Sequence, residues 1–141
     1  MTALSADKAR QTSGTPITIK APVNALSVIY EGSLVMYDST GFAVAASDAA
    51  SGDIIGVATH AVTGGSSDGD EVVICETGHL ERFAASGLAD TQNGQIVVVS
   101  DDATVTDALA AANDVQVGKL AYLESATVAW VLVGVLGQNA A

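Results

Sequence analysis

The chain has 141 residues and a formal net charge of −11, because five lysine and arginine residues stand against 16 aspartate and glutamate residues. A chain of this length makes one domain and buries enough surface to fold without disulfides or metal. The acidic excess argues against nucleic acid and anionic membranes as partners, since both attract basic surfaces.

The first 14 residues lack the apolar stretch of a signal peptide, and no run reaches the roughly 18 apolar residues expected of a membrane span. Cys75 is the one cysteine, which excludes an internal disulfide. Its apolar neighbours favour a buried thiol that acts as a small hydrophobe, and a lone cysteine suits a protein made in a reducing cytoplasm.

Residues 1–14 are small and polar without periodicity, and we expect an N-terminal arm there. Residues 15–141 are expected to form one β-rich domain, since short apolar runs alternate with turns rich in Gly, Asp, Ser and Asn. Such spacing predicts an all-β fold, a compact sandwich or barrel. The predicted strands are Thr15–Lys20, Ala25–Tyr30, Ser33–Tyr37, Phe42–Ala45, Ile54–Val62, Glu71–Glu76, His79–Ala84, Gln95–Ser100, Thr104–Thr106, Val117–Glu124 and Thr127–Leu136.

Three local features refine this prediction. Pro16 and Pro22 bracket the first strand and favour a place at a sheet edge. The dipeptide Thr77-Gly78 predicts a tight hairpin between the strands on either side of it. The runs Gln95–Ser100 and Thr127–Leu136 are apolar on both faces, so they are expected to be central or covered by a second sheet or a neighbouring subunit.

The sequence also contains an internal repeat. Gly32 to Gly56 and Gly94 to Gly118 both span 24 residues between glycines, and the second copy is offset by 62 residues from the first. Each copy passes from a strand through an Asp/Ser/Thr break and an Ala-rich stretch to a second strand. Two such units normally bury their apolar faces against each other, so we expect the two segments to superpose.

Few residues are arranged for chemistry. His60 and His79 could bind a metal with Glu76 or Glu81, but no HxH or HxxxH spacing supports this, and ordinary strand histidines are the simpler interpretation. The acidic stretch Gly64–Glu71 lacks the ladder of an EF-hand loop and is interpreted as a solvated hairpin tip. No nucleophile, phosphate-binding or dinucleotide motif is present, and the scattered aromatic residues are interpreted mainly as core. The sequence therefore predicts a structural or binding module, not an enzyme, with no cofactor.

Four stretches resemble the head decoration, or cement, proteins of tailed bacteriophages. They are Ala3–Asp7, Ile29–Val35, Ile55–Ala58, and Gly94–Asp102 with the downstream Val117-Gly118. The resemblance implies a β-rich body with an extended arm that binds the outer surface of an icosahedral HK97-type shell. Its partners would be the major capsid protein and two further copies in a homotrimer, and it would be made in the bacterial host cytoplasm and act on the virion.

The arm carries the expected contacts with the capsid. Leu4 would be an apolar anchor, and Lys8 and Arg10, next to Asp7, would meet acidic partners. Three alternatives stay open at this point. They are a head-fibre base, a tail-tube component that would form hexameric rings, and a carbohydrate-binding adhesion domain with an exposed aromatic platform.

Overall fold

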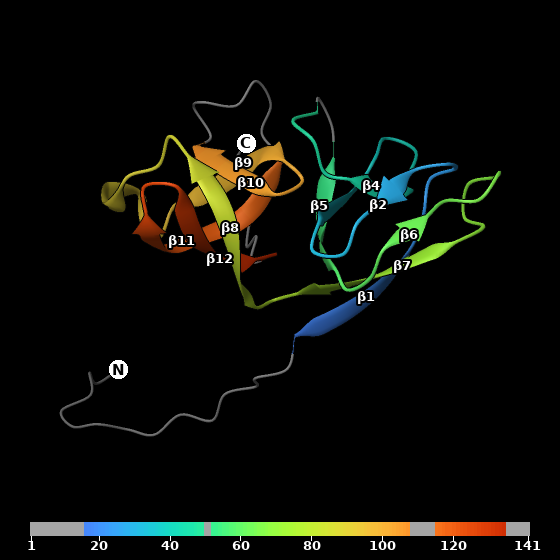
Figure 1. Ribbon diagram of the computed structural model, residues 1–141, viewed down its shortest axis with the longest axis horizontal. Coiled ribbons are helices and arrows are strands. Elements are labelled where there is room, and N and C mark those ends of the chain that lie inside the picture. The colour runs from blue at the N-terminus through green and yellow to red at the C-terminus, as the bar shows by residue number, and fades with distance from the viewer. Residues whose placement is uncertain (1–15, 50–51, 108–114, 135–141) are drawn as a thin grey trace, which may run out of the picture.

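A computed structural model of the chain describes residues 16–49, 52–107 and 115–134 (Figure 1). These residues form twelve β-strands and one short 3-10 helix, η1 (Asp90–Gln92), with no α-helix among them. The predicted all-β class is confirmed.

The first unit is a five-stranded sheet in the order β1-β7-β5-β3-β4. An isolated parallel bridge between Val23 and Ala43 brings its two edges toward each other. A two-stranded ribbon, β2 with β6, is attached to this unit. The bounds are β1 (Ile17–Pro22), β2 (Val28–Ile29), β3 (Leu34–Tyr37), β4 (Ala43–Ala45), β5 (Asp53–Ala58), β6 (Val62–Thr63) and β7 (Val72–Thr77).

The second unit is a closed barrel in the order β10-β8-β12-β11-β9. Its closure is the parallel pairing of β8 with β10, which spans Thr104 to Thr106. The bounds are β8 (Leu80–Ser86), β9 (Ile96–Asp101), β10 (Thr104–Asp107), β11 (Gln116–Ser125) and β12 (Val128–Val133). Figure 1 shows the barrel beside the first unit, with β7 and β8 connecting them.

The repeat in the sequence is also a repeat of strand pairing. In the first copy β3 lies between β4 and β5, and in the second β9 lies between β10 and β11. The registers coincide, because Val35 faces Gly56 as Val97 faces Gly118. The pairing register also shifts next to each of these glycines, at the same place in β5 and in β11.

The structural repeat extends beyond the segments that are alike in sequence. β7 pairs with β5 and β1 as β12 pairs with β11 and β8. The bridge Val23–Ala43 corresponds to the pair Ala85–Val105 that closes the second barrel. The first unit is therefore an opened form of the barrel made by the second.

The two units share a hydrophobic core. The first unit buries a smaller cluster that includes Ile29, Val73 and Cys75. The larger cluster fills the second barrel and also contains Leu34 and Val57, from β3 and β5 of the first unit. The hydroxyl of Ser33 donates to Asp102 across the same boundary at 3.0 Å. The apolar faces of the two units thus pack against each other.

Two of the local predictions were correct and one was wrong. β1 lies at the edge of its sheet, and β9 and β12 are central in the barrel. The hairpin predicted at Thr77-Gly78 does not form, because β7 and β8 pair with different neighbours and Gly78 joins the two units instead. The turn signal was real, but it marks a change of sheet.

Candidate interaction surfaces

The arm residues singled out for capsid binding, Leu4, Asp7, Lys8 and Arg10, lie outside the described residues. The candidate surfaces therefore come from the two units and the loops attached to them.

The histidines and nearby carboxylates do not converge on a metal. His79 lies 2.8 Å from Glu81 in a groove of about 250 Å³ that Glu76 also lines and His60 does not. His60 instead accepts a hydrogen bond from the backbone N–H of Ile74 at 3.2 Å. Within the described part of the chain, no three His, Cys, Asp or Glu side chains are placed to hold a metal ion.

The acidic loop Gly64–Glu71 holds the turn that precedes β2. Asp68 accepts a hydrogen bond from the N–H of Ala25 at 2.8 Å, and the carbonyl of Gly65 accepts one from Leu26 at 3.0 Å. Three further backbone bonds join the loop to the same segment, two to Val23 and one to Ser27. Residues 66–71 are exposed, as the sequence predicts, but the loop is not a hairpin tip, because β6 pairs with β2 and β7 with β1 and β5. Its role is to hold the turn before β2.

The turn and ribbon that this loop holds expose three large apolar side chains. Leu26 is 72% exposed, Val28 48% and Tyr30 66%, while Ile29 between them is fully buried. Val28 and Tyr30 flank the buried Ile29, as alternation along a strand predicts, and Leu26 lies in the turn just before them. We call these three side chains the apolar stripe.

A second exposed surface lies on the outside of the barrel. Tyr122 on β11 stacks against Trp130 on β12, with ring centroids 6.2 Å apart and planes 17° from parallel. Glu124 accepts hydrogen bonds from Arg82 at 2.9 Å and from the indole N–H of Trp130 at 3.1 Å. These bonds lower the pKa of Glu124, with that from Arg82 the stronger cause.

Sequence reasoning interpreted most aromatic residues as core and missed this pair. A signal was present, since a tight turn around Ala126 places Tyr122 opposite Trp130 in the register of β11 and β12. Tyr122 is 47% exposed, so the pair does not belong to the core.

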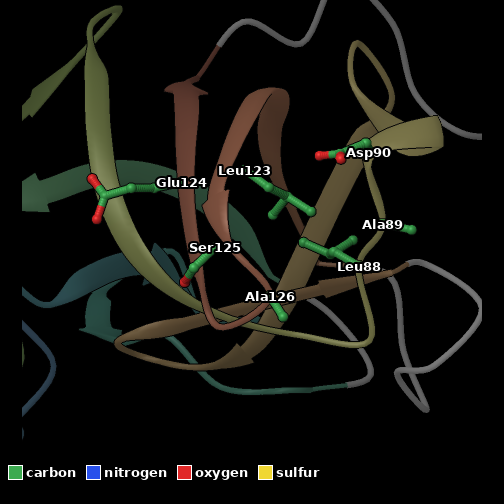
Figure 2. A pocket seen from close by; sticks show the side chains of 7 residues that line it. All are labelled: Leu88, Ala89, Asp90, Leu123, Glu124, Ser125 and Ala126. Carbon is green, nitrogen blue, oxygen red and sulfur yellow. The ribbon is translucent and has the colours of Figure 1, made fainter.

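A shallow groove of about 340 Å³ lies below the same hairpin (Figure 2). Leu88 and Leu123 line it together with Asp90 and Glu124, and Figure 2 shows the Glu124 side chain turned away from the two leucines. Both leucines also pack against the larger core. The groove can receive an apolar side chain, but it lacks converging polar groups that would orient a small ligand.

No protein-family model, no curated protein and no solved structure matches this chain. Among the described residues, no helix has the length and apolar character needed to cross a membrane.

Proposed function

We propose that the chain is a structural virion protein that binds the outer surface of an icosahedral tailed-phage capsid and stabilises the expanded shell. The observation that carries this proposal is where the resembling stretches lie. The stretches Ile29–Val35 and Gly94–Asp102 cover the same part of the internal repeat, the turns that lead into β3 and β9. Ile55–Ala58 and Val117-Gly118 occupy equivalent parts of β5 and β11. The likeness therefore follows the repeated framework and not isolated turns.

The physical character of the body supports the same function. A clamp on a shell needs a stiff fold, and a sheet and a closed barrel with a shared core meet this need. The net charge of −11 favours solubility before assembly. Attachment at many equivalent lattice positions converts modest contacts into high avidity.

The proposed partners are the major capsid protein of an HK97-type shell and two further copies in a homotrimer. The trimer rests on the resemblance alone, because one argument for it fails. The run Gln95–Ser100 was expected to be central or to be covered by a second sheet or a neighbouring subunit, and its Val97, Val98 and Val99 are all buried within the single chain.

Deletion of residues 1–14 tests the arm. We expect the shortened chain to keep its melting temperature, since the strands begin at Ile17, and to lose occupancy on expanded, undecorated shells. Lys8→Glu with Arg10→Glu should weaken binding most at low salt, where charge is least screened. Unchanged occupancy and shell stability after the deletion would exclude a role for the arm.

The stacked pair Tyr122–Trp130 favours a second candidate, glycan binding, because an exposed aromatic surface is what an adhesion domain requires. Binding to a glycan array that is lost in Trp130→Ala would support it.

Mass in solution separates the other virion assignments, since a tail-tube component forms hexamers.

A further inference from the structure

Comparison of the two units isolates a feature that only the first unit has. Positions 26, 28 and 30 of the first unit correspond to positions 88, 90 and 92 of the second, because the flanking pairings and turns coincide on both sides. The second unit has Leu88, Asp90 and Gln92 there. Leu88 is partly buried against the core, Asp90 is exposed, and Gln92 is half-buried with its side-chain amide donating to Asp107 at 2.6 Å.

The first unit places the apolar stripe at these positions. Leu26, Val28 and Tyr30 are 72%, 48% and 66% exposed, and they lie within five consecutive residues in and around β2. The local structure differs as well, because the first unit has the strand β2 where the second has the short helix η1. The first unit thus exposes three large apolar side chains where the second exposes none.

The backbone at Leu26 points in the same direction. Its φ of 62° makes it the one non-glycine residue with positive φ among those described. This left-handed conformation is unfavourable for a residue with a Cβ, and it persists only where surrounding contacts impose it. The five hydrogen bonds between the acidic loop and residues 23–27 impose it here.

The close fit of that loop shows how firmly the turn is held. A Cβ on Gly64 would overlap the carbonyl oxygen of Asn24, so the loop backbone packs directly on the turn. The corresponding connection of the second barrel, between β11 and β12, is a short turn without such a loop. The first unit therefore carries an additional segment whose contacts present Leu26 to solvent.

The charges around the stripe indicate what it contacts. Asp68 and Glu71 lie on the loop bonded to the turn, and Glu31 directly follows Tyr30. All three are exposed. An apolar stripe with an acidic border fits an apolar groove bordered by lysine or arginine. Figure 1 shows β2 and β6 on the side of the first unit away from the barrel, where a partner can reach them.

We infer that the apolar stripe is the docking site of the body on the shell, inserting Leu26, Val28 and Tyr30 into an apolar groove of the capsid protein bordered by basic side chains. This inference rests on the proposed function. It assigns to the body a contact separate from the one proposed for the arm.

The test uses the full chain and expanded, undecorated shells of the capsid protein encoded in the same genome. The variant Val28→Asp with Tyr30→Gln introduces the residues that the second unit has at the same places. We expect its Kd for shells to rise about tenfold or more, as for central anchor residues of interfaces, with an unchanged melting temperature. Leu26→Gly should also weaken binding while keeping or raising the melting temperature, because glycine relieves the left-handed backbone.

The matched control is Leu80→Thr, which removes another exposed leucine (49% exposed) and introduces the residue type found at position 18 of the first unit. Its affinity should equal that of the unaltered chain. Binding of Val28→Asp/Tyr30→Gln at the unaltered affinity would overturn the docking site and leave the proposed function standing. A change in oligomer mass would overturn it in favour of a contact between copies. Failure of the unaltered chain to bind any shell would overturn the proposed function and this inference together.

Discussion

Gly56 and Gly118 occupy equivalent places on β5 and β11, where a neighbouring strand passes too closely for any side chain. A Cβ on Gly118 would overlap the carbonyl oxygen of Leu132, whereas Gly94, with φ of 88°, has open space around it. We predict that Gly118→Ala lowers the free energy of unfolding by about 2–3 kcal/mol through steric strain. Gly94→Ala should cost about 1 kcal/mol, from its backbone conformation alone. Urea denaturation of both variants measures the order, and a larger loss in Gly94→Ala would contradict the close approach.

Cys75 is fully buried, and burial raises the pKa of its thiol to about 11 from an ordinary 9.0. The folded chain therefore keeps the thiol neutral, and we predict no reaction with a thiol reagent at pH 8 until urea unfolds the protein. The thiol ionises at a lower pH in the unfolded chain than in the folded chain. The contribution of Cys75 to the free energy of unfolding is therefore constant below pH 9 and declines between pH 9 and 11. Cys75→Val, with the residue type that β12 has at position 131, should lack this decline relative to the unaltered chain. Rapid labelling of the folded chain would contradict the burial.

At the scale of elements, the two units differ most in how they close. β8 and β10 pair over three residues, whereas β1 and β4 are connected by the single bridge Val23–Ala43. We predict faster amide hydrogen exchange in β1 and β4 than in β8 and β10, since an open seam leaves more strand edge in solvent. Mass spectrometry of exchanged peptides measures this. Equal protection of all four strands would show that the first barrel is closed in solution.

Most strands could be predicted from the sequence because their alternation and turn residues are local signals. The partners of β7 and β8 could not, because Thr77-Gly78 has the chemistry of a hairpin turn and only long-range pairing shows that it joins two sheets. The arrangement around Leu26 was equally inaccessible. It depends on hydrogen bonds from a loop some 40 residues further along the chain, as the bond between Ala25 and Asp68 shows (43 residues apart).

At the scale of the whole molecule, the shared core predicts that the two units unfold together. Leu34, Met36 and Val57 of the first unit belong to the cluster that fills the second barrel. We predict one cooperative thermal transition seen identically by tryptophan fluorescence, which reports on the second unit, and by far-ultraviolet circular dichroism. Two separated transitions would show that the units are independent domains.

The duplication could be anticipated only in part from the sequence. The glycine-to-glycine segments resemble each other because turns and central strands constrain residue type. β1 and β8 are equivalent in pairing but not in sequence, since Thr18 and Leu80 are at corresponding positions. One strand lies at an open edge and the other closes a barrel, so their side chains meet different surroundings and only the register is kept.

Electron cryo-microscopy tests most directly whether this chain binds the outer surface of the capsid. The samples are expanded shells of the capsid protein encoded in the same genome, prepared with and without this chain. We predict added density on the outer surface at three-fold and quasi-three-fold positions. The two joined units should fit into this density with β2 facing the shell. Shells without added density, or density confined to a tail tube, would contradict this prediction.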